Sequence, residues 1–334
     1  GYKPTVFEKN ERPGGMLVYG IPSYKLEKDV VDAEIEVLRQ MGVDIRCGVE
    51  VGRDITLDTL RREGYKAFYV AIGCQDGRSA GIPGEDTAGV MTAVDFLHPV
   101  EGRAVVIGGG NVAIDVARTS VRCGAAEVSM YCLEPRESMP ASAEEAAEAE
   151  DEGVAIRCGW GPKEILAEAG RVTGIVLKRC VSVFDENGRF CPRYDEADTI
   201  TVPCEHVFLS IGQSIRWGSL LDGAKVELGR GGAAVADPLT YQTAQPDIFV
   251  GGDVYTGPKF AIDAIAAGKQ GAESLHRFVH ENASLTIGRN RRQFKELDKE
   301  SLALESYDNG ARQSAGMDER IDYRRSFRDA HKTF

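Results

Sequence analysis

Apolar residues recur along the chain in short runs that end at a glycine or an acidic residue. Five such runs are Thr5–Glu8, Ala67–Gly73, Ala104–Ile107, His206–Gly212 and Asp247–Asp253. Short apolar runs of this kind are typical of buried parallel strands, and strands that alternate with helices are typical of α/β folds. The pattern therefore predicts an α/β protein with parallel sheets.

Other stretches have the spacing of helices or turns. Val30 to Met41 places apolar residues at helical intervals and is followed by Gly42, a common stop signal. Ala141–Glu152 is rich in Ala and Glu, which predicts a helix with a solvated acidic face; a place beside a nucleotide pocket is the alternative. Within Val183–Arg193, Asn187-Gly188 predicts a turn between two strands.

Residues 104–115 read AVVIGGGNVAID, an apolar strand that meets glycines and then a helical pattern. Gly108, Gly110 and Ala113 fill the G-x-G-x-x-G/A pattern of dinucleotide-binding turns. The first position allows a tight turn, the second a close approach to a pyrophosphate, and the third close packing of the helix on the sheet. The helix N-terminus offers free N–H groups to phosphate. The run predicts nucleotide binding, with a purely structural turn as the alternative.

The acidic residue after the next strand indicates which nucleotide is bound. The strand Glu127–Leu133 is followed by Glu134, 26 residues after Gly108. An acid at this position usually binds the ribose hydroxyls. A carboxylate also repels a 2′-phosphate, so Glu134 favours NADH. Arg136 could instead reach a phosphate, and a solvated Glu134 is the remaining alternative.

Parts of a second nucleotide site are recognisable. The strand Thr5–Glu8 ends in an acidic residue and is followed by Arg12–Gly15. This is the arrangement at the end of the second strand of an FAD-binding domain, where the acidic residue binds the adenosine ribose. Asp253 ends a later strand and is placed to hold a ribityl chain, and the helical run Phe260–Gly268 follows it. No strand and glycine loop precede Thr5, so we expect this chain alone to hold FAD weakly.

Composition narrows the class of protein. The 334 residues carry a net charge of −12, with 43% hydrophobic and 28% charged residues, which fits two folded domains. The core holds no concentrated basic stripe and no run near the ~18 apolar residues of a membrane span, so neither nucleic acid nor a membrane is an expected partner. Eight cysteines include no C-x-x-C pair, which argues against a metal or iron–sulfur site here and suits a cytoplasmic protein.

Several motifs together resemble the small (beta) subunit of glutamate synthase and its relatives. They are Arg12–Pro22, Lys28–Val31, Gly108–Arg118, Arg136–Pro140 and Gly251–Val254, within a resemblance that spans about residues 3–280. The resemblance implies an α/β fold with two Rossmann-like domains, the NAD(P)-binding domain being inserted in the FAD-binding domain. It also implies hydride transfer from NAD(P)H to FAD, with electrons passing to iron–sulfur clusters outside this chain.

The same resemblance implies a domain division and partners. Residues 1–98 and 213–280 are expected to form the FAD-binding domain, 101–212 the NAD(P)-binding domain, and 281–334 a C-terminal arm. The expected partner is an iron–sulfur or larger redox subunit, and the sequence leaves room for a homo-oligomer. NADPH-using members usually carry paired arginines where this chain has Leu133 and Glu134, which again favours NADH.

The predicted site residues fall into two sets, and none is assigned acid, base or nucleophile chemistry because the flavin carries the reaction. The FAD set is Glu8, Lys9, Gly14, Gly15, Met16, Tyr19, Gly20, Ile21, Val51, Ala71, Gly73, Gly252, Asp253, Phe260 and Ala261. The NAD(P) set is Gly108, Gly109, Gly110, Asn111, Val112, Ala113, Glu134, Arg136, Ile211 and Gly212. Two other functions remain: a disulfide reductase, disfavoured by the absent C-x-x-C, and a non-catalytic nucleotide-binding scaffold.

Overall fold

A computed structural model describes residues 2–93, 99–289, 298, 316–318, 321–322 and 326–327. The chain divides into two compact units. The first unit contains Gly1–Glu50, Cys74–Arg216 and Met317–His331, and the second contains Val51–Gly73, Trp217–Gly316 and Lys332–Phe334. Each unit is described by itself.

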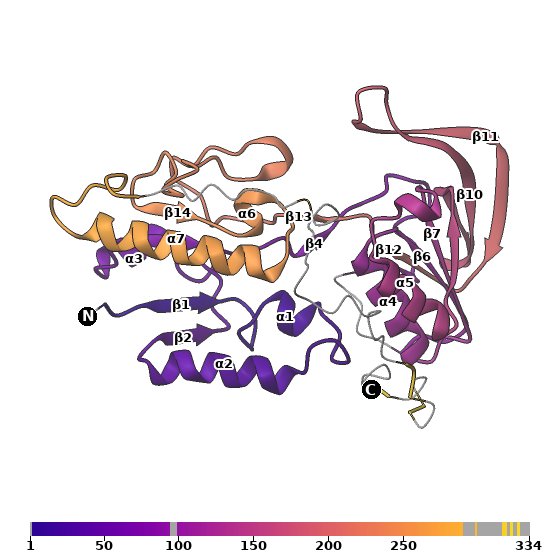
Figure 1. Cartoon of the computed structure of the whole chain (residues 1–334), viewed down its shortest axis with the longest axis horizontal. Helices are drawn as coiled ribbons and strands as arrows, with labels where there is room; N and C mark the ends of the chain where they lie inside the picture. Colours follow the sequence, from indigo (N-terminus) through magenta and orange to yellow (C-terminus); the bar gives the residue numbers. More distant parts are fainter. Residues whose placement is uncertain are drawn as a thin grey trace, which may run out of the picture. The chain divides into compact units, whose positions relative to one another are not determined.

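A five-stranded parallel sheet forms the centre of the first unit. Its order is β5-β12-β6-β7-β8, and its strands are β5 (Val90–Thr92), β12 (His206–Leu209), β6 (Arg103–Ile107), β7 (Glu127–Cys132) and β8 (Ala155–Cys158). Figure 1 labels β12, β6 and β7 of this sheet. Helices α4 (Asn111–Arg122) and α5 (Ala143–Asp151) follow β6 and β7, and the 3-10 turn η1 (Arg136–Ser138) precedes α5. The apolar runs of the two central strands β6 and β12 are explained by burial on both faces.

The two faces of this sheet are covered by different layers. Val106 packs with the apolar residues of α4 and α5 in one core cluster. Val105 and Ile107 point the other way and pack with Trp160, Ile175 and other residues of a second sheet. Alternation along one strand therefore places helices on one face and a sheet on the other.

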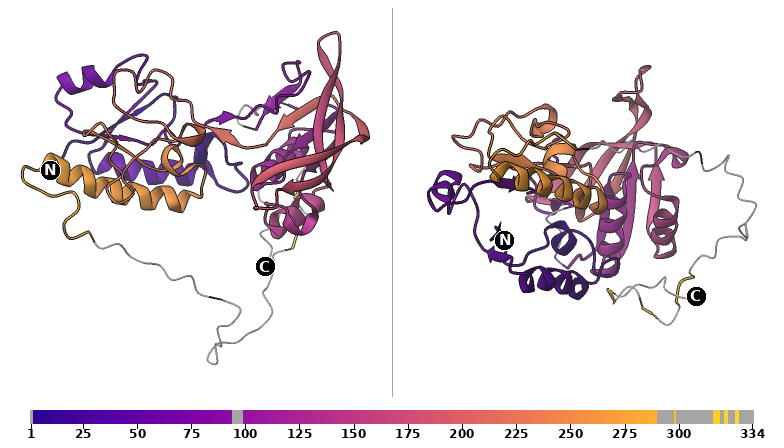
Figure 2. Two further views of the ribbon diagram at one scale, coloured as in Figure 1. Left: turned by 90° about the horizontal axis from the view of Figure 1, so that it is seen from above. Right: turned by 60° about the vertical axis from the view of Figure 1, so that its left-hand side comes forward.

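The second sheet is antiparallel and contains the longest strands of the unit. Its order is β11-β10-β9, with β9 (Trp160–Glu168), β10 (Arg171–Phe184) and β11 (Phe190–Pro203). The β10–β11 hairpin extends well beyond the parallel sheet in both views of Figure 2. The predicted turn at Asn187-Gly188 is confirmed, although the strands run further toward it than the sequence pattern indicates.

The N-terminal part of the first unit is a smaller α/β element. Strands β1 (Thr5–Glu8) and β2 (Asp44–Cys47) pair in parallel, joined through α1 (Met16–Tyr19) and α2 (Lys28–Gln40). Gly14 has a φ of 122°, and a Cβ there would lie 2.5 Å from Val18 Cγ2, so the turn into α1 requires glycine. Strands β4 (Asp76–Gly77) and β13 (Gln213–Ser214) form a short antiparallel pair.

The second unit is built on another parallel pair, β3 (Phe68–Val70) and β14 (Ile248–Val250). Its helices are α3 (Leu57–Arg62), α6 (Asp253–Thr256) and α7 (Ala261–Val279), with the 3-10 turn η2 (Arg230–Gly232). Tyr69 of β3 packs so closely on Gly251 and Gly271 that a Cβ at either would approach its ring atoms or hydroxyl within 2.1 Å. The two glycines therefore allow α7 to lie against the strand pair.

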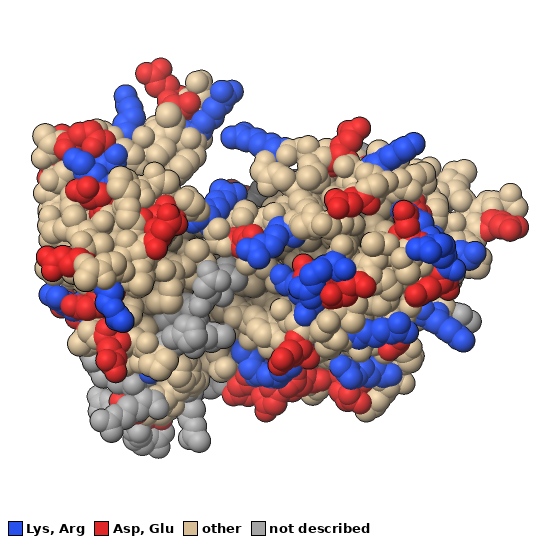
Figure 3. All heavy atoms as spheres, turned by 180° about the vertical axis from the view of Figure 1, so that it is seen from behind, with Lys and Arg blue, Asp and Glu red and all other residues tan. Residues whose placement is uncertain are grey.

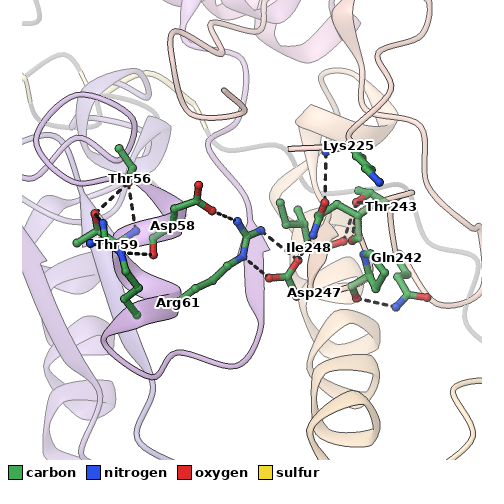
Figure 4. A network of polar contacts seen from close by, with 12 residues as sticks. Thr56, Asp58, Thr59, Arg61, Lys225, Gln242, Thr243, Asp247 and Ile248 are labelled. Carbon is green, nitrogen blue, oxygen red and sulfur yellow. Dashed lines mark hydrogen bonds and ion pairs between the residues drawn. The ribbon is translucent and has the colours of Figure 1, made fainter. Parts of the chain in front are cut away.

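A polar network fixes the start of β14 (Figure 4). Arg61 of α3 donates to both carboxylate oxygens of Asp247, at 2.6 and 3.1 Å, and to Asp58 at 2.5 Å. Gln245 donates to Asp247 at 2.8 Å. Because β14 leads directly to Gly251 and Asp253, this network holds the strand whose end carries part of the predicted FAD site.

The elements agree with most of the sequence pattern, with one correction. The predicted acidic helix is present as α5, but Glu152 at its C-terminal end is fully buried rather than solvated. It is buried because two arginines of α4 point at it. The predicted division into domains stays a prediction, and most of the expected arm 281–334 lies outside the described residues.

Charged side chains of both signs are interspersed on the face shown in Figure 3. Among the residues that the structure describes, no helix combines the length and apolar character that crossing a membrane requires.

Candidate nucleotide-binding site

The glycine loop joins β6 to α4 with the geometry that the fingerprint predicts. Gly108 has a φ of 146°, and a Cβ there would lie 2.4 Å from the carbonyl oxygen of Ser210. Ala113 is fully buried against the sheet. Gly110 caps the N-terminus of α4 with extended backbone, and a Cβ there would meet nothing within 4 Å. Open space thus lies beside Gly110, at the positive end of a 12-residue helix.

The middle glycine brings the loop against the end of β7. A Cβ at Gly109 would lie 2.9 Å from Cys132 Cβ and 3.0 Å from Glu134 Oε2. Glu134 is half-buried, so its carboxylate is held over the loop rather than turned to bulk solvent. The predicted ribose ligand and the predicted phosphate loop are therefore brought together at the carboxyl ends of adjacent parallel strands, where α/β sheets bind ligands.

Further contacts shape the rim of this cradle. The backbone N–H of Ala141 donates to the Gly109 carbonyl at 2.9 Å, and that of Ser142 donates to Asn111 Oδ1 at 3.0 Å. Asn111 thereby orients the first residues before α5, and Ser142 caps that helix by accepting from Glu145 N–H. The side-chain oxygen of Asn111 thus binds the protein itself, and the predicted contact of Asn111 with a nucleotide stays a prediction. Val112, one residue on, is exposed.

Arg136 is paired with a carboxylate of α5. It lies in the exposed turn η1 and forms an ion pair with Glu150 of α5 at 2.7 Å. The guanidinium is therefore engaged by a carboxylate of the protein at the position where a 2′-phosphate would compete for it.

The end of β12 forms the other side of the cradle. Ser210 donates its N–H to Ile107 O at 2.7 Å, which locks β12 to β6 next to Gly108. Ile211 is half-buried and Gly212 has a φ of 113°. Ile211 and Gly212, both predicted site residues, thus come directly after Ser210, which contacts the glycine loop.

Two cysteines that the sequence analysis treated as scattered meet at this edge. Cys132 and Cys158 are register partners at the ends of β7 and β8, and their Sγ atoms lie 3.6 Å apart. Burial, together with the proximity of Cys158, raises the pKa of the Cys132 thiol. No spacing signal could reveal this pair, because 26 residues separate the two cysteines and only strand register brings them together.

A buried ionic cluster lies below the cradle, between α4, α5 and the segment after α1. Arg118 and Arg122 both donate to Glu152 Oε1, at 2.8 and 2.5 Å, and both guanidiniums lie over the ring of Tyr24, at 4.8 and 4.1 Å. Burial raises the pKa of Tyr24. Lys25 bridges Asp115 and Glu145 at 2.5 and 2.9 Å. The cluster fixes residues 24 and 25 on the helix that carries the glycine loop.

The N-terminal members of the predicted FAD set lie in the first unit. Glu8 ends β1 and accepts the N–H of Asn10 at 2.8 Å, and Lys9 follows it. Gly14 and Gly15 form the turn into α1, which holds Met16 and Tyr19; Lys28 Nζ donates to the carbonyls of Leu17 and Ile21 near Gly20. The Tyr19 hydroxyl accepts the N–H of Arg12 at 3.0 Å. The segment is therefore held in place by hydrogen bonds between its own residues.

The remaining members lie in the second unit, at the ends of its strands. Ala71 and Gly73 follow β3, and Gly252 and Asp253 follow β14. Burial raises the pKa of Asp253, whose Oδ1 accepts the N–H of Lys259 at 3.2 Å. Phe260 and Ala261 begin α7, and Phe260 is strongly exposed; Val51 forms an isolated bridge with Ile55. Assignment of the whole set to FAD stays a prediction.

The described residues contain no group of three or more His, Cys, Asp or Glu side chains arranged to hold a metal ion. What the geometry provides is an open glycine backbone, a helix N-terminus and a carboxylate close to one another. These residues fit a dinucleotide, because a side chain at Gly109 would strike Glu134 while Gly110 leaves room for a phosphate.

Comparison with known proteins identifies the class. A sequence model of the family described as pyridine nucleotide-disulphide oxidoreductase matches residues 49–268. The chain therefore belongs to the pyridine nucleotide-disulphide oxidoreductase family. Its fold is similar to that of Mycobacterium tuberculosis FprA in complex with NADPH, with a TM-score of 0.71 at 20% identity over 82% of this chain and 77% of that one. The predicted class of fold, with two dinucleotide-binding domains, is confirmed.

Particular relatives lie within the group that the motifs indicated. The chain is 37% identical to the NADP(+)-dependent formate dehydrogenase subunit beta of Moorella thermoacetica, over 85% of this chain and 41% of the relative. It is 34% identical to the glutamate synthase [NADPH] small chain of Halomonas elongata, over 82% and 62%. It is also 34% identical to the NAD-dependent dihydropyrimidine dehydrogenase subunit PreT of Escherichia coli O157:H7, over 84% and 63%.

These likenesses confirm the predicted resemblance to glutamate synthase small subunits and the oxidoreductase class. The chain spans less than two-thirds of the length of each of these three curated relatives, from 41% to 63%.

Proposed function

We propose that this chain binds NAD(P)H in the cradle around Gly110 and Glu134 and serves an FAD-dependent oxidoreductase. The observation that carries the proposal is the open glycine loop at the N-terminus of α4, which faces a half-buried carboxylate across adjacent strand ends. When bound, the flavin would supply hydride acceptance from the nicotinamide. The protein's own contribution is placement and exclusion of water.

The residues of the cradle would bind different parts of the nucleotide. The backbone N–H groups at the start of α4 would bind the pyrophosphate, and Gly110 would leave space for it. Glu134 would accept hydrogen bonds from the ribose hydroxyls. Glu8 and Asp253, acids at the ends of β1 and β14, would do the same for the ribose and ribityl chain of FAD.

A substitution at Gly110 tests the cradle without disturbing the fold. The backbone there is extended and a Cβ has space, so Gly110→Ala should fold normally. The added methyl would occupy the proposed phosphate position and raise the dissociation constant for NADH at least tenfold, measured by fluorescence titration. Gly229→Ala is the matched control, because a Cβ there makes only ordinary contacts. Equal affinities in all three proteins would contradict the assignment of the loop.

We further propose that NADH is preferred over NADPH. Glu134 supports this preference, since a carboxylate beside a 2′-phosphate is electrostatically unfavourable. Arg136 is paired with Glu150 and so offers little compensation. The names of the relatives divide, with NADP(+), NADPH and NAD each represented.

Exchanging the charge at residue 134 tests the preference. Glu134→Arg should shift the ratio of NADPH to NADH affinity by about tenfold or more, which corresponds to about 1.4 kcal/mol. Glu137→Arg makes the same change of charge on the exposed turn η1 and should leave the ratio nearly unchanged. Tighter binding of NADPH by the unaltered chain would contradict the role of Glu134.

Electron exit is proposed to run through iron–sulfur centres of a partner or of further domains. The relatives named as a formate dehydrogenase subunit and a glutamate synthase small chain support an assembly with a larger redox subunit. A non-catalytic scaffold is the second candidate, favoured only by the absence of an assigned catalytic side chain. Reduction of FAD by NADH is followed by absorbance after excess FAD is added to the purified protein. A scaffold would bind NADH without accelerating the bleaching of the flavin over the rate without protein.

A further inference from the structure

We propose that Cys132 and Cys158 are a reversible thiol–disulfide site, and that bond formation between them weakens nucleotide binding in the cradle. The site itself rests on the geometry of two strand ends. Its effect on nucleotide affinity rests on the proposed function, so the two parts are tested separately.

The backbone places the two thiols within reach of each other. Cys132 and Cys158 are register partners on adjacent parallel strands, so their side chains leave the sheet on the same face. Neighbouring strands lie about 4.8 Å apart, which falls within the roughly 4.4–6.8 Å between Cα atoms that disulfides span. The Sγ atoms are already 3.6 Å apart, so rotation about the side-chain bonds closes the remaining gap.

Exposure sets the order of the two chemical steps. Cys158 is half-exposed, whereas Cys132 is almost fully buried and burial raises its thiol pKa. With a small disulfide such as oxidised glutathione as oxidant, the Cys158 thiolate attacks one sulfur and releases one glutathione thiolate. Cys132 then loses its proton and attacks the Cys158 sulfur of the mixed disulfide, releasing the second glutathione. Two protein thiols are oxidised by two electrons and one glutathione disulfide is reduced to two thiols.

The position of Cys132 connects this bond to the cradle. The Cys132 thiol contacts the backbone carbonyl oxygen of Glu134 at 3.6 Å, and Cys132 Cβ is the nearest neighbour of a Cβ built at Gly109, at 2.9 Å. Turning the sulfur toward Cys158 removes the thiol from the Glu134 carbonyl, while Cys132 Cβ stays beside Gly109. The backbone of Glu134 therefore loses a contact that holds it at the end of β7, next to the glycine loop.

The chain offers a control thiol. Cys191 near the start of β11 is exposed and lies in the long hairpin, away from the glycine loop in sequence and in strand order. A reagent that modifies thiols by accessibility alone reaches Cys191 first. A bond between Cys132 and Cys158 requires their juxtaposition.

The first experiment tests the bond itself. The protein is incubated with oxidised glutathione, remaining thiols are alkylated, and peptides are mapped by mass spectrometry. We expect a peptide pair linking Cys132 to Cys158, whether or not exposed Cys191 also carries glutathione, and reversal of the link by dithiothreitol. Cys158→Ser and Cys158→Ala should each abolish the link, and Cys191→Ser should keep it. Glutathione on Cys191 without any Cys132–Cys158 link would overturn the proposal.

The second experiment tests the consequence. NADH titration of the oxidised protein should give a dissociation constant at least tenfold higher than that of the reduced protein, restored by dithiothreitol and insensitive to oxidation in Cys158→Ser. An unchanged constant in the linked protein would overturn the proposed effect of the bond on nucleotide binding. A reduced protein that binds no NADH, yet still forms the link, would refute the proposed function and leave the thiol–disulfide site standing.

Discussion

Two ionic networks use the same chemistry in the two units but differ in their access to water. In the first unit, Arg118, Arg122 and Glu152 are almost fully removed from solvent and lie against Tyr24. In the second, Arg61 and Asp247 form a bidentate pair whose side chains keep 27% and 17% of their exposure (Figure 4). The first network fixes the helix of the nucleotide loop, and the second fixes the strand that leads to Asp253.

This difference in exposure determines how much stability is lost when an ionic contact is removed from the folded protein. A buried charge that loses its partner keeps its full desolvation cost, whereas a half-exposed charge is resolvated. Tyr24 shares both guanidiniums by cation–π contact, and the carbonyl of Ser326 accepts from Arg122 at 2.7 Å. We therefore expect substitutions in the first network to have larger effects than equivalent ones in the second.

The largest effect is expected at Glu152. Glu152→Gln leaves two buried guanidiniums without their shared carboxylate and should lower the free energy of unfolding by about 3–5 kcal/mol. Urea denaturation followed by circular dichroism measures it. Glu148→Gln is the matched control, since Glu148 meets the same Arg118 at 2.6 Å but keeps 28% of its exposure. Equal losses in the two variants would remove the distinction based on burial.

Tyr24 comes next. Tyr24→Leu removes the ring from beneath two cations, where desolvated cation–π contacts contribute about 2 kcal/mol or more. Tyr24→Phe keeps the ring and loses only the hydroxyl, which donates to the Asp115 carbonyl at 3.3 Å, so about 1 kcal/mol is expected. A Phe variant as unstable as the Leu variant would show that the hydroxyl, not the ring, supports the cluster.

A smaller effect is expected in the second network. Asp247→Asn keeps the shape but removes the charge that Arg61 faces, and should cost about 1–2 kcal/mol in the same denaturation measurement. Asp54→Asn, which alters the more exposed pair with Arg53, provides the control and should change stability by less than about 0.5 kcal/mol. A loss at Asp247 as large as that at Glu152 would contradict the comparison.

The smallest effect is a pH dependence of opposite sign in the two units. Burial opposes ionisation of Asp247, but hydrogen bonds from Arg61 and Gln245 outweigh it and lower its pKa. The unfolded state then binds more protons, so Asp247 adds stability that is lost as pH falls below about 4. Burial raises the pKa of Asp115 against the opposing charge of Lys25. The folded state then binds more protons, and Asp115 makes stability fall as pH rises from about 4 toward that raised pKa.

Two variants separate these contributions. Asp247→Asn should flatten the acid-side loss of stability, and Asp115→Asn should make stability rise more steeply with pH above about 4 than in the unaltered protein. Melting temperatures from pH 3 to 7 provide the measurement. A change of slope in the same direction in both variants, relative to the unaltered protein, would contradict the assigned pKa directions.

The sequence predicted the elements better than it predicted what they bury. Strands β1 and β6 lie where the apolar runs indicated, and Gly108, Gly110 and Ala113 have the predicted geometry, because turn and packing requirements are local. Glu152 was expected in solvent, since helical periodicity cannot show that two arginines 30 and 34 residues earlier point at it.

Features that depend on register or on distant segments were missed. The 14-residue strands β10 and β11 were recognised only by their turn. Cys132 and Cys158 are adjacent through strand pairing alone. Tyr24 gains its partners from α4, 91 to 98 residues away in the chain. Contacts between residues far apart in the chain depend on the tertiary structure, and a single sequence contains no periodic pattern that predicts them.

The hairpin of β10 and β11 ends in a turn where additional residues can be inserted into the chain. Its 14-residue strands span roughly 45 Å at about 3.3 Å per residue. The tip is self-contained: Asp185 Oδ1 accepts the N–H groups of Asn187 and Arg189, and Phe184 stacks edge-on with Phe190. The contacts of the tip therefore do not depend on the rest of the unit. We expect residues inserted after Asn187 to leave the glycine loop at Gly110 undisturbed, so a label or a second domain can be attached at this turn.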